Sequence, residues 1–206
     1  MEQKLHTISD FEQMDIRFRA NFFNSIIGFK SAVLVGTQSA KGRDNVAVFS
    51  SLFHMGSNPP LFGMLFRPSG EVERHTLANI EDTGFYTLNN ILSSFAEKAH
   101  QTSAKYGSEI SEFDACGLGR TFIPDFKPPF VTESNIRLGM AWLESIPVVH
   151  NGTTLVIGKV LYANVPDEVV EKDGYIDIEN AGTVAVSGLD SYHLGQRIAR
   201  FPYAKP

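Results

Sequence analysis

The chain has 206 residues, of which 43% are hydrophobic and 20% are charged, and 18 basic against 23 acidic side chains give a formal net charge of −5. This composition suits one large domain or two small ones with a sizeable core, and it is untypical of disordered chains. The acidic balance argues against a chain-wide basic footprint for nucleic acid or for an anionic membrane. The single cysteine, Cys116, excludes an internal disulfide and a cysteine-based metal cluster, and we interpret it as a partly buried free thiol rather than a nucleophile.

The N-terminal residues 1–6 contain no long apolar stretch, so the sequence shows no secretory signal. No apolar run approaches the ~20 residues that a membrane-spanning helix requires. Asn151-Gly152-Thr153 matches a glycosylation sequon, but without an export signal we interpret it as a turn. We therefore expect a cytoplasmic protein.

An amphipathic helix is predicted over residues 10–27. Ser9 and Glu12 have the spacing of a capping box, and Gly28 supplies a stop. Apolar side chains recur in this segment at helical spacing, namely Phe11, Met14, Phe18, Phe22 and Ile26. The stripe suits either a core face or a subunit contact, and core packing is the simpler interpretation.

Three strands are predicted over residues 31–67. An apolar run at 32–37 is followed by a turn-rich linker containing Lys41-Gly42, which favours a hairpin. The stretch 45–60 begins as an apolar strand and ends in small and polar residues and Pro59-Pro60, which we expect to form a rigid bend. A third apolar run then ends at Arg67.

The remaining elements are predicted from the same kinds of pattern. They are a helix over 71–80, a strand over 85–89, a helix from Ser93, an ordered loop over 107–134, a hairpin of strands 135–146 and 153–165 around Asn151-Gly152, and short strands at 176–178 and 183–186. No linker-like break or internal repeat interrupts the chain, so residues 1–206 are predicted to form one domain. Because strands outnumber helices and come in hairpins, the fold class predicted is mainly β, an antiparallel barrel-like sheet with peripheral helices.

Several functional motifs are missing from the chain. Gly117-Leu118-Gly119 has no third glycine in register, and no phosphate loop, His-Glu-x-x-His or Gly-x-Ser-x-Gly occurs. The six histidines are scattered and have no zinc-ligand spacing. A dinucleotide loop, a metal centre and a nucleophile-elbow hydrolase are therefore all disfavoured.

A phosphate-binding composition occurs without a phosphate loop. Arg67 stands at a strand end, and Arg74, His75 and Thr76 stand at or near a helix start. Guanidinium groups, hydroxyls and free backbone N–H groups suit a phosphate dianion. On composition alone, caps and solvated charges are the more common explanation for such residues.

The pair Ser50-Ser51 also has two interpretations. Its hydroxyls either satisfy the local backbone at a strand end or donate along the ribityl chain or ring edge of a flat phosphorylated cofactor. A flavin ring needs donors at its pyrimidine end and an apolar wall on one face, with the other face open. Backbone amides of residues 45–51, together with Phe49 or Phe53, are candidates for these roles.

Several blocks of the chain, taken in order, resemble the flavin reductase-like family of FMN-binding split-barrel proteins. They are Lys30–Thr37, Asn45–Ser51, Ser57–Leu61, Arg74–Asn89, Ser111–Phe113, Pro129–Ser134, Leu155–Val160 and Gly188–Tyr192. The resemblance covers roughly residues 20–205. Each block alone is loose, whereas their order together is fairly specific.

The resemblance implies a Greek-key split barrel that works as a homodimer, with FMN near the subunit boundary. It implies that the ring and ribityl chain are lined by Thr37, Asn45, Val48, Phe49, Ser50 and Ser51, and that the phosphate is bound by Arg67, Arg74, His75 and Thr76. Many relatives have Asp where His75 stands. Relatives also often place a histidine on the open side of the flavin, where either His150 or Thr154 stands here.

Three functions follow as hypotheses. The first is an FMN-dependent oxidoreductase that takes hydride from NADH or NADPH at flavin N5 and passes electrons to an acceptor that the sequence does not identify. The second is an FMN-binding electron carrier without nicotinamide oxidation, and the third is a split-barrel assembly module without redox chemistry. Because the cofactor itself carries out hydride chemistry, we assign no catalytic side chain. No metal, nucleic acid or membrane partner is predicted.

Overall fold

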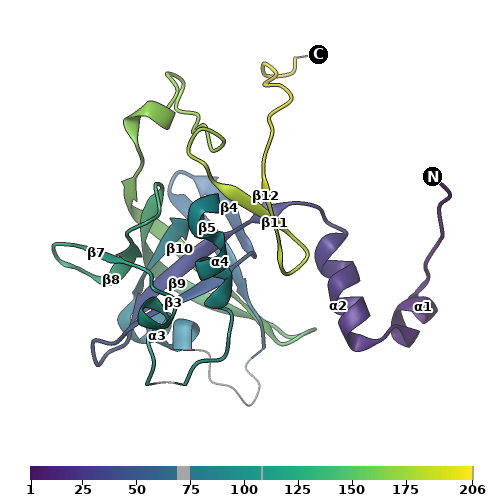
Figure 1. Cartoon of the computed structure of the whole chain (residues 1–206), viewed down its shortest axis with the longest axis horizontal. Coiled ribbons are helices and arrows are strands. Elements are labelled where there is room, and N and C mark those ends of the chain that lie inside the picture. The colour runs from purple at the N-terminus through teal and green to yellow at the C-terminus, as the bar shows by residue number, and fades with distance from the viewer. Residues whose placement is uncertain (69–74, 108, 206) are drawn as a thin grey trace.

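The computed structural model describes residues 1–68, 75–107 and 109–205, and Figure 1 shows a β-barrel with peripheral helices and an N-terminal arm beside it. Its helices are α1 (Ile8–Gln13), α2 (Ile16–Ser25), α3 (His75–Thr83), η1 (Ser93–Phe95), α4 (Ala96–Gln101), α5 (Glu112–Ala115) and η2 (Asp167–Val169). Its strands are β1 (Lys30–Ser31), β2 (Val33–Gln38), β3 (Asp44–Phe49), β4 (Leu52–Ser57), β5 (Pro60–Phe66), β6 (Phe85–Asn90), β7 (Arg120–Ile123), β8 (Phe126–Val131), β9 (Arg137–Val148), β10 (Thr153–Asn164), β11 (Val184–Ser187) and β12 (Ser191–Leu194).

Seven strands form one antiparallel sheet in the order β3-β2-β6-β9-β10-β5-β4. Its two edge strands, β3 and β4, are consecutive in the chain and are separated only by Ser50 and Ser51. Two intervening residues reach at most about 11 Å, so the edges of the sheet must meet at this point. The sheet therefore curls into a barrel that is split along one line, and we call residues Phe49–Leu52 the seam.

The barrel wall is buried on both faces. Val33, Val35, Leu88 and Met140 belong to the interior cluster, whereas Ala32 and Leu34 belong to a second cluster on the outer face, with Phe113 and Val131. Successive side chains of a strand point to opposite faces, so a strand covered on both sides must be continuously apolar. Burial on both faces explains the apolar run at 32–37. The mainly antiparallel barrel confirms the predicted fold class.

The predicted middle strand over 45–60 is two strands, not one. β3 pairs with β2 at one edge of the sheet, whereas β4 pairs with β5 at the other edge. Ser50 and Ser51 interrupt the pairing, and the Ser51 hydroxyl donates to the backbone oxygen of Leu65 at 2.7 Å. The predicted bend is confirmed, since the chain reverses at the cis Asn58–Pro59 peptide bond before β5.

The predicted helix over 10–27 is likewise two helices. Met14 has extended backbone (φ −64°, ψ 138°), and the Asp15 carboxylate then caps α2 by accepting from the backbone N–H groups of Arg17 and Phe18 at 2.9 and 3.1 Å. Thr7 rather than Ser9 caps α1, since Asp10 accepts from both the N–H and the hydroxyl of Thr7 at 2.7 Å. The Asp15 carboxylate thus caps a second helix, and it divides the single helix that the apolar stripe predicted.

The expectation of a loop over 107–134 is also wrong in part. The segment contains α5 and the two-stranded hairpin β7–β8, which turns at Asp125 with φ +62°. Pro128 and Pro129 lie in β8, where a two-stranded ribbon leaves room for residues without an N–H donor. Figure 1 shows this hairpin on the side of the barrel away from the N-terminal arm.

The hairpin predicted around Asn151-Gly152 is confirmed as β9–β10, the longest pair of strands in the described residues. The predicted strand at 183–186 is β11, but residues 176–178 form no strand beyond a bridge between Val170 and Ile176. β11 pairs with β1 and β12 in a separate small sheet.

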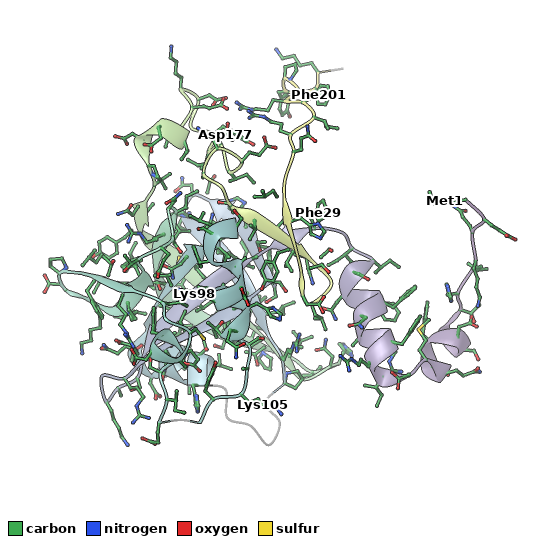
Figure 2. All side chains as sticks on the ribbon, in the orientation of Figure 1. Met1, Phe29, Lys98, Lys105, Asp177 and Phe201 are labelled. Atoms are coloured by element: carbon green, nitrogen blue, oxygen red, sulfur yellow. The ribbon has the colours of Figure 1, made fainter. Side chains whose placement is uncertain are left out.

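Beyond β12 the C-terminal tail runs along the loop 167–182, as Figure 2 shows with Phe201 and Asp177 labelled. Arg197 pairs with Glu171 at 3.3 Å and with Asp177 at 3.4 Å. Arg200 pairs with Glu171 at 2.6 Å, and its guanidinium lies 4.2 Å from the ring centre of Tyr175. These ion pairs hold the tail against the loop.

The N-terminal arm, residues 1–27, has no buried residue in either of its helices. An aromatic cluster formed by Phe11, Phe22 and Phe23 joins the two helices to each other, with ring centres 5.0–6.3 Å apart. Ile16, Phe18 and Ile26 are exposed. In the part of the chain that the structure describes, no helix is long and apolar enough to cross a membrane.

Candidate functional site

The seam contains three of the residues predicted to contact a cofactor, and Val48 directly precedes it. Phe49 points into the barrel, where its ring centre lies 4.8 Å from that of Phe66, and Val48 points to the opposite, outer face. Ser50 and Ser51 are half-buried between the two sheet edges. The seam therefore offers small hydroxyl side chains and unpaired strand-edge backbone next to an aromatic wall.

Two cations lie near the seam. Arg67 follows β5 directly and is exposed, and Lys30 in β1 donates from Nζ to the backbone oxygen of Gly188 at 2.7 Å. Partial burial lowers the pKa of Lys30, and the nearby charge of Arg67 lowers it further. Two like charges held this close raise the local positive potential, which favours an anion between or beside them.

The N-terminus of α3 forms a second group, at the other end of β3. Thr37, 0% exposed, accepts a hydrogen bond from the Asn79 amide at 3.0 Å. The orientation of the Asn45 amide is assigned from its hydrogen-bond partners, and in this orientation its oxygen accepts from the Thr76 hydroxyl at 3.2 Å. These bonds fasten the first turns of α3 to β2 and β3.

Glu112 in α5 completes this second group. Its carboxylate is 8% exposed, and the Asn45 amide nitrogen lies 2.9 Å from one of its oxygens. Burial raises the pKa of Glu112, while hydrogen bonds from backbone N–H groups and the charge of His75 act in the opposite direction. A buried carboxylate therefore stands behind the start of α3.

The predicted site residues thus fall into two groups joined by β3. Thr37, Asn45, His75 and Thr76 gather at the start of α3, whereas Val48–Ser51 and Arg67 gather at the seam. Asn45 and Ser51 are six residues apart on an extended segment, or about 20 Å. Arg74 lies outside the described residues.

His150 and Thr154 are the two candidates for the position where relatives often carry a histidine, and they lie in different parts of the β9–β10 hairpin. His150 is exposed in the turn, whereas Thr154 is in β10 and pairs with Phe66, directly before Arg67. Thr154 is therefore the nearer of the two to the seam.

Among the described residues, the nucleophile candidates are in inert surroundings. Cys116 is buried and free, as predicted, with its sulfur 3.7 Å from the Tyr106 hydroxyl, and burial raises its pKa. Burial also raises the pKa of the Tyr86 hydroxyl, which lies in the barrel interior. Neither environment produces a reactive anion at neutral pH.

Comparison with known proteins decides the family. The model of the flavin reductase-like domain matches residues 28–181, well over half of the chain. The chain belongs to the flavin reductase-like family. The resemblance seen in the sequence is thereby confirmed, and the match begins just after the N-terminal arm.

Solved structures of related proteins agree with this family assignment. A Shewanella frigidimarina protein assigned as a flavin reductase with a split barrel domain is 44% identical, with a TM-score of 0.93 over 98% of this chain and 100% of that one. Nitrilotriacetate monooxygenase component B from Bacillus cereus is 20% identical, with a TM-score of 0.85 over 97% and 100% of the two chains. An uncharacterized protein of Aquifex aeolicus is 23% identical over 146 residues, covering 70% of this chain and 74% of its own.

Three residues that lie beside the predicted site residues were not assigned from the sequence. Lys30 opens a block that carries the resemblance, but its position near Arg67 depends on the contact of β1 with β4. Asn79 lies one helical turn after Thr76, and this spacing was available as a signal. Glu112 lies in the block Ser111–Phe113, but its contact with Asn45 depends on the packing of α5 against β3 and is not visible in the sequence.

Proposed function

We propose that this protein is an FMN-binding oxidoreductase that accepts electrons from NADH or NADPH. The observation that carries the proposal is the split between the edge strands β3 and β4. The seam, with its hydroxyls and nearby cations, lies at one end of β3, and the N-terminus of α3 lies at the other end. An extended ligand with a flat ring and a terminal phosphate suits this layout. Family membership supports a flavin as that ligand.

The phosphate is proposed to lie at the start of α3. Thr76 and His75 occupy its first turn, where backbone N–H groups point out of the helix and favour an anion. Arg74 precedes the helix and is proposed to add a charge-assisted hydrogen bond. Asn45, Asn79 and Thr37 position this turn through the hydrogen bonds described above.

The ring is proposed to lie at the seam. Ser50 and Ser51 supply hydroxyls there, and the backbone of an edge strand supplies N–H groups that no neighbouring strand accepts. Lys30 and Arg67 favour negative charge near this end, which stabilises an electron-rich reduced ring. When bound, a flavin accepts a hydride from reduced nicotinamide, and the chain contributes orientation, hydrogen bonds and access.

A homodimer is proposed as the working form. Two short helices without a buried residue are marginal in water on their own, and packing of their apolar side chains is what stabilises such helices. Exposed Phe18 and Ile26 therefore suit contact with a second copy. By two-fold symmetry each arm would cover the same surface on the other protomer.

The experiment that tests the function is anaerobic reduction of the FMN-loaded protein with NADH and, separately, NADPH. Bleaching of the flavin absorbance near 450 nm at a rate well above that of free FMN (~10-fold or more) is the expected result for one nucleotide or both. A rate equal to that of free FMN, with FMN still bound, would overturn nicotinamide oxidation and favour the electron-carrier alternative. A protein that binds no FMN would favour the assembly-module alternative.

A further inference from the structure

A small pocket lies between the β7–β8 hairpin and the outer face of β9 and β10, away from the residues proposed to hold flavin. Its volume is about 190 Å³, and it is lined by Thr121, Ile123, Phe130, Arg137, Tyr162, Ala163 and Asn164. Phe130 is buried, and the Tyr162 ring packs on Phe126 with ring centres 5.3 Å apart. The walls are therefore mostly apolar and aromatic.

Arg137 is the one charged side chain among these lining residues. Its Nε has no access to solvent and no hydrogen-bond partner. Among the described residues, no carboxylate lies within ion-pair distance of its guanidinium. Protein atoms shield Nε itself, so a ligand in the pocket meets the Nη donors, for which the described residues supply no acceptor. A guanidinium that lines a mostly apolar pocket without an acceptor is costly, which favours an acceptor from outside the chain.

The neighbours of Arg137 explain why the chain supplies no acceptor. In register it lies between Asn89 of β6 and Asn164 of β10. The Asn89 amide is already saturated, since it donates to Leu34 O and Thr87 Oγ1 and accepts from the Val131 N–H. Asn164 is exposed, and no hydrogen bond joins its amide to another of the described residues, so it is available to a ligand.

Other arginines of this chain show the contrast. Arg120, on the same hairpin as part of the pocket, pairs with Asp44 at 3.1 Å and with Asp114 at 2.8 Å. Arg197 and Arg200 both pair with Glu171. Carboxylates of this chain thus pair with Arg120, Arg197 and Arg200, which are partly exposed like Arg137. Among the described residues, Arg137 has no such carboxylate partner.

We propose that this pocket binds a small carboxylate with a compact apolar body, of the benzoate class. The planar guanidinium matches a carboxylate with parallel N–H donors, and the Asn164 amide adds a further donor. Phe130, Ile123 and the Tyr162 ring enclose the apolar body. The volume admits only a fragment-sized ligand, since pockets for larger ligands start at roughly 300 Å³. The inference is independent of the flavin site, with which it shares no residue.

Isothermal titration of the full chain with benzoate tests the proposal. Benzoate is expected to bind, and Arg137→Gln is expected to weaken it about tenfold or more, because a charge-assisted pair is replaced by a neutral amide. Lys127→Gln is the matched control, since it removes one positive charge from the exposed face of the same hairpin and is expected to leave the affinity unchanged. Benzamide, neutral and of the same shape, is expected to bind much more weakly than benzoate.

A second variant tests the pocket without touching the charge. Ile123→Trp fills the cavity and is expected to abolish benzoate binding, while thermal unfolding reports whether each variant is folded. Equal affinity of benzoate and benzamide, unchanged affinity in a folded Arg137→Gln protein, or no detectable heat with wild type would each overturn the proposal. Equal weakening by Lys127→Gln would also overturn it, since it would show general attraction to positive charge.

Discussion

At the scale of single residues, Glu112 links the packing of the barrel to the proposed phosphate site. Its buried carboxylate faces the Asn45 amide, and Asn45 in turn holds Thr76 at the start of α3. A carboxylate in this position fixes the amide orientation, yet its charge opposes an anion bound at the helix start. Its protonation state therefore affects both stability and ligand binding.

Glu112→Gln tests the stability effect. Burial raises the pKa of Glu112 in the folded state above its ordinary value of 4.5. The neutral form is thus the favoured form in the fold, and its stabilising contribution is present below pH 4.5 and is lost as the pH rises through the folded pKa. The melting temperature of Glu112→Gln minus that of wild type is expected to rise between pH 4 and pH 7, measured by circular dichroism. A difference that falls over this range would contradict the assignment.

The phosphate site has its own residue-scale prediction. Arg74→Ala is expected to weaken FMN binding about 10-fold or more, because a sheltered charge-assisted hydrogen bond contributes ~1.5–3 kcal/mol. Thr76→Val is expected to weaken FMN binding less, because the Thr76 hydroxyl donates to the Asn45 amide and acts by positioning the start of α3. Riboflavin, which lacks the phosphate, is expected to lose much less. Flavin fluorescence quenching measures both affinities. Equal losses for the two ligands would place these side chains away from the phosphate.

At the scale of elements, close packing of β6 against β10 fixes the barrel. A Cβ on Gly158 of β10 would overlap the hydroxyl oxygen of Tyr86, whose ring is 1% exposed and has no room to move. Gly158→Ala is therefore expected to destabilise the protein by at least about 1–3 kcal/mol. Gly195→Ala is the matched control, because nothing lies within 4 Å of its added Cβ, and it is expected to change stability by less than about 0.5 kcal/mol. Urea unfolding of both variants decides the comparison, and equal stabilities would contradict it.

Sequence patterns predicted those elements whose causes are local. Asn151-Gly152 predicted the β9–β10 turn. Elements that depend on distant partners were missed. In the sequence, residues 45–60 look like one continuous strand, and the break at Ser50-Ser51 becomes visible only when β3 and β4 are assigned to opposite edges of the sheet. The β7–β8 hairpin was missed because its prolines resemble a loop, and its packing over β6 and β2 is invisible in the sequence.

The same distinction applies to the candidate site. Thr37, Asn45 and Thr76 were singled out through the family resemblance, and the fold places the three beside one another through Asn79 and Glu112. Arg67 was grouped with the phosphate residues because it is near them in sequence. Its proximity to Lys30 follows from the fold, in which β1 lies against β4, the partner of the strand β5 that Arg67 follows.

At the scale of the whole molecule, the N-terminal arm has no buried residue in either of its helices. Figure 1 shows α1 and α2 beside the barrel, and their apolar side chains are mostly exposed. Phe18→Glu is expected to shift the full chain from dimer toward monomer in sedimentation velocity, since it places a charge on the exposed apolar surface. Gln13→Glu introduces the same charge on the neighbouring helix and is expected to leave the dimer intact. A wild-type monomer, or a fully dimeric Phe18→Glu protein, would contradict the proposed role of the arm.

A flavin is proposed to bind along β3, between the seam and the start of α3. Equilibrium dialysis of the full chain against FMN, with the bound flavin quantified by its absorbance near 450 nm, tests it most directly. Wild type is expected to bind one FMN per chain, and changing Ser50 and Ser51 both to Val is expected to cause a large loss of affinity while the apoprotein stays folded by circular dichroism, although the loss of the Ser51–Leu65 hydrogen bond lowers its melting temperature. Absence of bound FMN in folded wild type, or an unchanged affinity in the double variant, would contradict it.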